Sequence, residues 1–468
     1  MVRPRSDRSL LNPGSVISPD SASQLGGLRR QLGLGSAVAA TVGEAIGVGI
    51  FLTPAGMARQ LGSPFWLLIV WLMMGLMAVS GALCFGGLAA RYPEAGGAYV
   101  YLREAYGPRV AFLYGWMQLL VLDPGVTASL AVGLAAYAGS VARITPADEK
   151  FLGIVVILTL AAANIYGARL GAAFLQSLTW LKIGALMVLV VWAVALRLGN
   201  WSHFSPFITR RAASTPFIAA LAASLIAAFY SFGGWWEAAK IAGEVRNPER
   251  IMPRALTIGV SLVTLVYILV TGVFIYLLPM ASITSDETFM AQAGQRLFGA
   301  TGSDIMAALV MLCVLGSLAA LLILSPRVYY AMARDGLFFH QVARAHPRFG
   351  TPARAIAIQA VLASFLVAVG TFDAIVAYFI FVAVVFLGLT VAGIIRLKRR
   401  VSDGPTIRIP GYPFTPLAFL ILVGMLLILL AIHNPFQAFW GEAVVLAGIP
   451  AFRLVLRRDQ NAKAKTLG

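Results

Sequence analysis

The sequence predicts an all-α, polytopic membrane protein, and three observations support this fold class. Hydrophobic residues make up 59% of the 468-residue chain and charged residues 12%, about half of the roughly 25% that is usual in soluble domains. Apolar runs long enough to cross a bilayer core of about 30 Å recur along the chain. Two of these runs are interrupted by glycines. Composition and pattern together exclude an ordinary soluble globular protein.

Twelve apolar segments separate along the chain, so we expect twelve transmembrane helices in a single membrane domain over 31–456. The flanking segments 1–30 and 457–468 are polar. We expect both to be disordered cytoplasmic tails, and 1–30 lacks the apolar core of a cleavable signal peptide. The expected helices lie near 36–58, 65–90, 110–140, 151–168, 172–197, 216–243, 254–278, 304–334, 355–371, 373–396, 412–432 and 436–456.

The net charge of +17 orients the chain in the membrane. A basic chain can indicate nucleic-acid binding, but here the positions of the charges decide. With the N-terminus in the cytoplasm, 27 of the 36 Lys and Arg residues fall on the cytoplasmic side, 7 on the opposite side and 2 within helices. This is the positive-inside distribution. We therefore expect both termini in the cytoplasm and no nucleic-acid partner.

The glycine interruptions fall at 43–51 and 229–237, in the first and sixth expected helices. Glycine inside a helix weakens it and lets the backbone leave helical geometry. At membrane depth, freed N–H and C=O groups persist only where they line a cavity or are buried in protein. Paired interruptions of this kind indicate the binding site of a transporter. The sequence thus predicts a site for a small solute between helices 1 and 6.

The positions of the two broken helices also favour an inverted repeat. Helix 6 comes five helices after helix 1, so it enters the membrane from the opposite side, as such a repeat requires. Residues 36–197 would form the first repeat, 216–396 the second, and 412–456 two additional helices. This prediction depends on hydropathy and glycine placement, since the two halves share no visible sequence similarity.

Four motifs, in order, resemble those of the amino acid–polyamine–organocation (APC) superfamily, and within it the L-amino-acid transporter branch and its bacterial relatives. The resemblance covers residues 30–455 and implies a LeuT-like fold of five plus five helices with discontinuous helices 1 and 6. It also implies a bacterial inner membrane. The motifs lie at 47–51 with Pro54, at 81–84 with 93–99, at 232–235 with 244–248, and at 327–336.

In helix 1, the resemblance places the substrate carboxylate on the main-chain N–H groups of Val48, Gly49 and Ile50. Free N–H groups and partial positive charge at a helix N-terminus suit a carboxylate. Glycines at 47 and 49 would allow its close approach. The alternative is that these glycines only permit close helix packing, which is common in membranes.

In helix 6, the resemblance assigns the substrate ammonium to the carbonyls of Tyr230 and Gly233, helped by Ala45. Unwound carbonyls hold cations in this way. Tyr230 would also be a gating aromatic over the substrate; the alternative, favoured for Trp236, is ordinary packing within the bundle. The full expected substrate-binding set is Ala45, Ile46, Gly47, Val48, Gly49, Ile50, Tyr230, Ser231 and Gly233.

Lys182 lies well inside the fifth expected helix, where an ammonium group is expensive and by default functional. Its position matches a lysine of many sodium-independent superfamily members, whose charge stands in for a bound sodium ion. Burial disfavours the charged form of lysine. It could therefore be a proton-coupling group, a fixed cation linking helix 5 to helix 1, or half of a structural pair.

Three acids also fall within expected helices: Glu44, Asp123 and Glu237. Glu237 and Lys240 are spaced i, i+3 and could neutralise each other. The animal L-amino-acid exchangers usually have a small polar residue at the position of Glu44, a basic one at Asp123 and an uncharged one at Glu237. These departures allow an extra carboxylate to favour cationic amino acids or to titrate.

The expected function is secondary active transport of L-amino acids, neutral before cationic, sodium-independent, as an exchanger or a proton-coupled symporter. Within transport, the alternative is an antiporter of polyamines or cationic amino acids. A transporter-like sensor or structural membrane subunit is the alternative outside transport. The sequence shows no nucleophile–histidine constellation, phosphate-binding loop or metal-ligand pair, so we expect no enzyme, cofactor or metal. Cys84 and Cys313 lie in apolar runs, which indicates no disulfide-linked accessory subunit.

Overall fold

The computed structural model describes residues 28–142, 145–210, 216–283, 286–369, 380–400, 407–433 and, within 435–454, all but 436–438, 440 and 444. Most of the expected tails at 1–30 and 457–468 lies outside these ranges. Within them the chain is helical, and its strand-like pairing is a single parallel bridge between Leu32 and Val245. The all-α fold class is confirmed.

The helices follow one another with short connections. Short 3-10 or π segments, labelled η, interrupt or join them. In order, the elements are α2 (Leu34–Ala45), α3 (Gly49–Leu61), α4 (Pro64–Arg91), α5 (Ala98–Tyr106), α6 (Pro108–Met117), η1 (Gln118–Leu122), α7 (Asp123–Ala142), α8 (Pro146–Tyr166), α9 (Ala168–Ala195), η2 (Trp201–Phe204), α10 (Phe217–Phe232), η3 (Trp235–Glu244), α11 (Pro248–Leu277), η4 (Met280–Ser282), α12 (Asp286–Phe298), η5 (Gly299–Thr301), α13 (Gly302–Leu324), α14 (Pro326–Arg334), η6 (His340–Ala343), α15 (Ala353–Val369), α17 (Ile380–Arg400) and α18 (Phe414–His433).

Nine helices of the described residues are long and apolar enough to cross a membrane, and the bent pair α2–α3 makes a tenth. They correspond to the expected helices 1 to 8, 10 and 11. The expected helix 9 is the shorter apolar helix α15, and the expected helix 12 falls on 435–454, which is described with gaps. The total of twelve and the inverted repeat therefore stay predictions.

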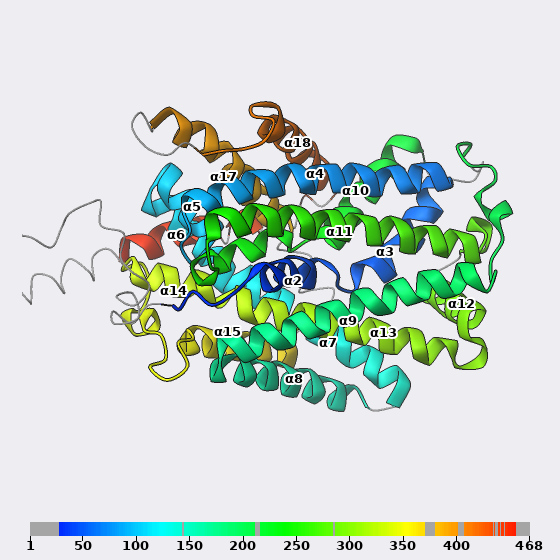
Figure 1. The fold of residues 1–468 in the computed structure, drawn as a ribbon, viewed down its shortest axis with the longest axis horizontal. Helices are drawn as coiled ribbons and strands as arrows, with labels where there is room; N and C mark the ends of the chain where they lie inside the picture. Colours follow the sequence, from blue (N-terminus) through cyan, green and yellow to red (C-terminus); the bar gives the residue numbers. More distant parts are fainter. Residues whose placement is uncertain are drawn as a thin grey trace, which may run out of the picture.

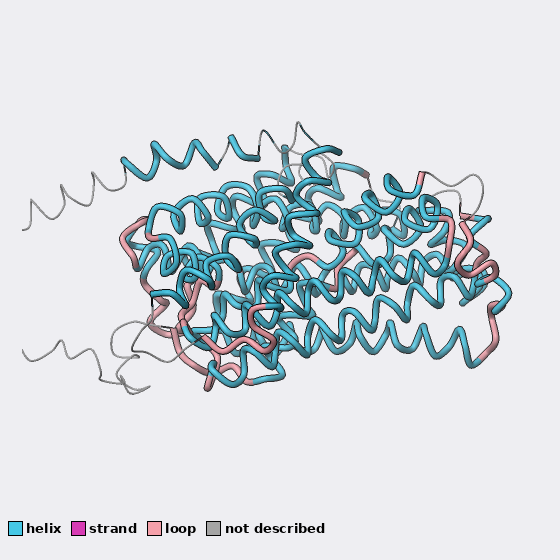
Figure 2. The backbone as a smooth tube through the Cα atoms, turned by 90° about the horizontal axis from the view of Figure 1, so that it is seen from above, coloured by secondary structure: helices cyan, strands magenta, loops and turns pink. Residues whose placement is uncertain are grey.

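The broken helix α2–α3 lies in the middle of the bundle (Figure 1). Its first half packs against α9, α11 and α13, and its second half packs against α10. Figure 2 shows loops gathered at the two ends of the molecule, with short non-helical stretches in its interior. Non-helical backbone in the interior of a membrane protein must be buried or line a cavity. The fold thus places both helix breaks at the depth where a solute would bind.

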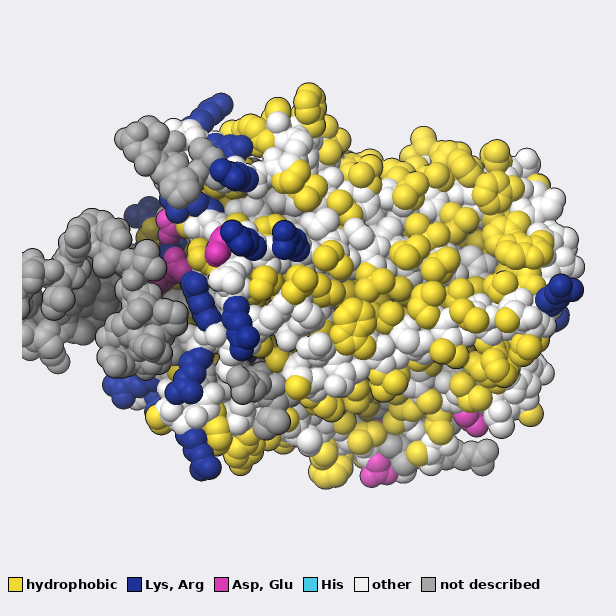
Figure 3. Space-filling model, viewed as in Figure 1, with side chains coloured by type: hydrophobic (Ala, Val, Ile, Leu, Met, Phe, Trp, Pro, Cys, Tyr) yellow, Lys and Arg dark blue, Asp and Glu magenta, His cyan; other side chains and the backbone are white. Residues whose placement is uncertain are grey.

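The surface has the charge distribution of a multi-pass membrane protein. Lys and Arg side chains gather at one end, beside α5 and α14, while the long middle of the molecule is apolar in Figure 3. Large exposed apolar side chains occur on α9 and α18, such as Leu181 and Ile428. Side chains of this kind are stable against lipid, which offers no polar partner.

The sequence motifs at the ends of helices 6 and 8 meet at the basic end of the bundle. Glu244 of η3 and Arg327 of α14 are both buried, and two hydrogen bonds join them, Nε to Oε1 at 2.7 Å and Nη2 to Oε2 at 3.2 Å. A buried charge is tolerated when it is paired and hydrogen-bonded. This bidentate pair holds η3 against α14.

A second ion pair at the same end joins the loop after helix 2 to the end of helix 8. Arg103 of α5 donates to Asp335 at 2.8 Å and to Glu94 at 3.1 Å. The Tyr99 hydroxyl donates to Asp335 at 2.8 Å. Burial, together with the negative charge of Asp335, raises the pKa of Tyr99, so the phenol stays protonated as a donor. These contacts hold α5 and the loop before it against the end of α14.

Candidate functional site

The first helix breaks between Ala45 and Gly49, where the two halves are bent by 45°. The amides at the start of α3 have no carbonyl one turn earlier to receive them, as at any helix N-terminus. Gly49 lies against the second break, since a Cβ at this position would be 2.7 Å from both Cα and Oγ of Ser231. Only glycine fits there, which explains one glycine of the interruption.

The sixth helix breaks at Gly233 and Gly234, after which the chain continues as the 3-10 segment η3. Gly234 has a φ of +97°, a conformation that favours glycine. The side chain of Glu44, from the end of α2, fills the space that a Cβ of Gly234 would need. The second interruption is therefore shaped by the first.

Two side-chain contacts connect the breaks directly. Thr53 and Ser231 hydroxyl oxygens are 2.8 Å apart. The Tyr267 hydroxyl from α11 lies 2.7 Å from the Ala45 carbonyl oxygen and 2.7 Å from that of Ser231. The Ala45 carbonyl, expected to help hold an ammonium group, thus already accepts a hydrogen bond. The Gly47 amide also donates to it at 3.1 Å, and Tyr267 is a bridging residue that the sequence did not indicate.

Lys182 is completely buried on α9 and reaches the end of α2. Its Nζ donates to the carbonyl oxygens of Gly43 at 2.8 Å and Ile46 at 2.6 Å. The hydroxyl oxygen of Ser317, from α13, lies 2.8 and 3.0 Å from the same two carbonyl oxygens, and its one proton can be donated to either. This geometry is that of a fixed cation joining helix 5 to the broken helix 1. Its functional role stays a prediction.

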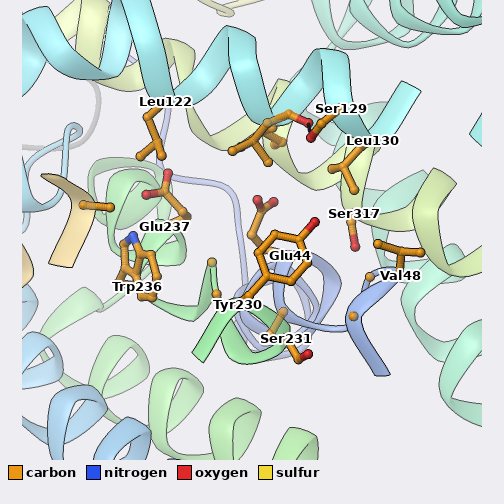
Figure 4. A pocket seen from close by; sticks show the side chains of 18 of the residues that line it. Glu44, Val48, Leu122, Ser129, Leu130, Tyr230, Ser231, Trp236, Glu237 and Ser317 are labelled. Atoms are coloured by element: carbon orange, nitrogen blue, oxygen red, sulfur yellow. Dashed lines mark hydrogen bonds between the residues drawn. The ribbon is translucent and has the colours of Figure 1, made fainter. Parts of the chain in front are cut away.

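A cavity of about 100 Å³ lies between the two breaks, large enough for several water molecules or a small solute. Figure 4 shows Glu44, Tyr230 and Glu237 at its wall, with the side chain of Val48 at the far end from Trp236. The lining residues are Glu44, Ala45, Gly47, Val48, Gly49, Leu122, Asp123, Val126, Ser129, Leu130, Phe229, Tyr230, Ser231, Gly233, Gly234, Trp236, Glu237, Ser317, Leu321 and Ala383.

Most residues of the expected site are brought together by the fold, and a few lie behind it. Of the expected substrate-binding set, all but Ile46 and Ile50 line the cavity. Those two side chains are fully buried in the core. Lys182 lies behind the wall, separated from the cavity by the carbonyls it binds. The three acids in question all line the cavity.

Several residues that line the cavity were not predicted from the sequence. Ser317 and Ser129 are small polar residues inside apolar runs, and such positions are a weak signal for a lined cavity. The sequence left two roles for Trp236, lining the pocket or packing within the bundle. In the structure it does both, because it lines the cavity and stacks on Phe229, with ring centroids 5.9 Å apart. Aliphatic lining residues such as Leu122 carry no signal in a sequence that is mostly aliphatic.

Asp123 is the centre of a buried polar network at one side of the cavity. It follows the π segment η1, a local widening that often occurs at functional sites. Its Oδ1 accepts from Ser325 at 2.9 Å and Lys240 at 3.3 Å, and its Oδ2 accepts from the Tyr329 hydroxyl at 2.8 Å. Lys240 also pairs with Glu237, which confirms the i, i+3 contact. One lysine therefore serves two carboxylates.

Glu44 differs from the other two acids because no ion pair joins it to another residue in the part of the chain that the structure describes, whereas Asp123 and Glu237 are both paired with Lys240. The residue is 9% exposed, and its Oε2 has no hydrogen-bond partner among the described residues. A buried ionised carboxylate without a partner is strongly unfavourable. The site is therefore incomplete as it stands, and a positively charged group or a proton would complete it.

Replacing Lys240 with Met should lower thermal stability strongly. The change keeps an unbranched side chain of similar volume but leaves Asp123 and Glu237 as buried acids without their cation, and breaking such a pair costs about 3–5 kcal/mol. Thermal unfolding in detergent should show a clearly lower Tm, which the double variant Lys240→Met with Asp123→Asn partly restores. The exposed Lys150→Met is the matched control, and an equal Tm for both single variants would contradict the network.

Half-helices that face each other across a cavity, in a multi-pass helical bundle, define the class of membrane transporters with broken helices. The chain belongs to the amino acid permease family, whose model matches residues 32–449.

Individual relatives agree with this family. The chain is 29% identical to the serine/threonine exchanger SteT of Bacillus subtilis over 435 residues, 91% of this chain and 97% of that protein. It is 28% identical to the human large neutral amino acids transporter small subunit 2 over 97% of this chain and 86% of that protein. It is 29% identical to the human b(0,+)-type amino acid transporter 1 over 82% of this chain and 79% of that protein. All three names describe exchangers or transporters and none an enzyme, so the chain is an amino acid transporter by family.

Proposed function

We propose that this protein is a sodium-independent secondary active transporter that moves L-amino acids by alternating access. The observation that carries the proposal is the cavity between two facing helix breaks, with backbone amides at one side and carbonyls at the other. The family and its relatives support amino acids as the solute. An inner-membrane location with cytoplasmic termini and an inverted-repeat architecture belong to the same proposal.

The two helix ends supply opposite partial charges to the two ends of an amino acid. The substrate carboxylate would bind at the N-terminus of α3, on the amides of Val48, Gly49 and Ile50, where the helix dipole is positive. The ammonium group would bind at the carbonyls of Tyr230 and Gly233. An amino acid would thereby bridge the two broken helices, and this bridge couples binding to their relative position.

Lys182 provides the physical reason for sodium independence. The carbonyl oxygens of Gly43 and Ile46 and the hydroxyl of Ser317 are hard oxygen ligands of the kind that a metal cation such as Na⁺ uses. The Lys182 ammonium already occupies the space between them, 2.6 to 3.5 Å from the three oxygens. An ammonium at this position satisfies the end of α2 without a bound metal ion.

Alternating access requires the two ends of the bundle to open in turn. At the basic end, which we assign to the cytoplasm by the positive-inside rule, the pairs Glu244–Arg327 and Asp335–Arg103 close the path. Opening to the cytoplasm would separate elements joined by these pairs. Because ligand binding can shift only states that it distinguishes, the substrate bridge between α3 and η3 is the element that biases the change.

Uptake of labelled amino acids into proteoliposomes tests the proposal. We expect saturable uptake of at least one amino acid, unaffected by replacing sodium with choline. Preloading with unlabelled substrate separates exchange from symport, since only an exchanger requires it, and an imposed pH gradient detects proton coupling. Binding without uptake or exchange under any gradient would contradict transport and indicate a sensor.

A further inference from the structure

The charges around the cavity do not balance within the part of the chain that the structure describes. Three carboxylates, Glu44, Asp123 and Glu237, line the cavity, and the two buried lysines beside them are Lys182 and Lys240. Lys240 is bound to Asp123 and Glu237, and Lys182 is bound to backbone carbonyls. With all five side chains ionised, the cluster carries one net negative charge. Glu44 is the carboxylate of the three that has no ion pair within the described residues.

Glu44 is placed to meet a ligand rather than another residue. Its side chain packs over Gly234, between the two helix breaks. In Figure 4 its carboxylate lies between Glu237 and the ring of Tyr230 and points into the cavity. The oxygen without a partner is thus both buried and turned toward the space that the substrate would fill.

An ordinary amino acid does not supply the missing charge. A zwitterion is neutral overall, so its binding leaves one net negative charge buried in the membrane, which is costly. An amino acid with a cationic side chain adds one positive charge and balances the cluster. Tyr230 and Trp236 at the cavity wall add aromatic faces that attract such a cation when they lie under it.

We propose that Glu44 forms, with Glu237 nearby, a subsite for the positively charged side chain of an amino acid such as arginine or lysine. The proposal rests on the proposed transport function and specifies its substrate class. It reverses the order in which the sequence alone ranks neutral and cationic substrates, because the sequence does not show that Glu44 lacks a partner while Glu237 has one.

Two other occupants of Glu44 make different predictions. The substrate's own α-ammonium group could bind there, in which case every amino acid would depend equally on Glu44. A proton could neutralise Glu44 instead, in which case neutral amino acids would bind better at lower pH. The charged groups that act on Glu44 are Glu237, Lys240, Lys182 and Asp123, and the aromatic ring beside it is that of Tyr230.

The test compares pairs of ligands of nearly equal shape that differ in charge. Arginine is paired with citrulline and lysine with norleucine, in competition against the transported label in proteoliposomes and in direct binding to the purified protein. For the wild type we expect each cationic ligand to bind at least about tenfold more tightly than its neutral isostere, the effect of one hydrogen bond between charged groups.

The variant Glu44→Gln should remove this preference and leave citrulline and norleucine unchanged. Glu44→Asp, which keeps the charge, should retain part of it. Glu249→Gln is the matched control, because it removes an exposed carboxylate outside the cavity. Retained binding of the neutral ligands shows that Glu44→Gln is folded.

Each other outcome overturns the proposal. Equal affinity of the wild-type protein for charged and neutral isosteres would by itself overturn the proposal. An equal loss for all ligands in Glu44→Gln assigns Glu44 to the α-ammonium group, and tighter binding of neutral ligands at low pH that is lost in Glu44→Gln assigns it to a proton. Uptake of neutral amino acids alone rejects the subsite and keeps the transporter, whereas no uptake of any amino acid rejects the transporter itself.

Discussion

Replacing Gly49 with Val should abolish substrate binding. A Cβ at this position would lie 2.7 Å from the Cα of Ser231 and 2.8 Å from its Cβ, well inside van der Waals contact. The contact includes backbone, so no rotamer of Ser231 relieves it. The two helix breaks must therefore separate, and the amides at the start of α3 leave the position from which they would bind a carboxylate.

Equilibrium binding of labelled substrate to the purified variant measures this effect. We expect no saturable binding at concentrations about a hundredfold above the wild-type Kd, since displaced charge-assisted hydrogen bonds are each worth about 1.5–3 kcal/mol. Gly424→Val, in α18, is the control because a Cβ there meets no atom within 4 Å. Wild-type affinity in a folded Gly49→Val protein would remove Gly49 from the carboxylate site.

The positions of the helix breaks could be predicted because glycine acts locally. Gly49 and Gly234 interrupt long apolar runs, and a helix interior without such residues has no reason to break at membrane depth. The site residues adjacent to the breaks then follow from chain continuity. This is why Val48 and Tyr230 were predicted to lie near each other although 182 positions separate them in the sequence.

The partners of the buried charges could not be predicted, because they come from helices that are distant in sequence. Asp123 is held by Ser325, between α13 and α14, and by Tyr329 of α14, and nothing local marks these residues as its ligands. Tyr267 likewise reaches both breaks from α11. The i, i+3 spacing did indicate the pairing of Glu237 with Lys240, but not that Asp123 shares the lysine. The charge left on Glu44 emerges only from the complete set of pairings.

Replacing Lys182 with Ala should reduce transport to background. Removal of the ammonium leaves the carbonyls of Gly43 and Ile46 with the single hydroxyl of Ser317 as their side-chain donor. Because an unsatisfied buried polar group costs about 1–3 kcal/mol, the end of α2 loses its preferred position and the bridge between the two breaks weakens. Initial rates of uptake in proteoliposomes measure the loss, with Lys150→Ala on the exposed surface as the control.

The behaviour of this variant in sodium and across pH separates the interpretations of Lys182. If Lys182 is a fixed cation, added Na⁺ can enter between the three oxygens and restore part of the uptake, whereas protons cannot. If it carries the coupled proton, sodium restores nothing, and the wild-type dependence of uptake on the pH gradient disappears while exchange of bound substrate survives. Normal transport by Lys182→Ala at every pH, with or without sodium, would show that the ammonium is neither.

The contacts to Gly43 and Ile46 favour the fixed cation, because a lysine that must release its proton would have to exchange two short hydrogen bonds to carbonyls for weaker ones in every cycle.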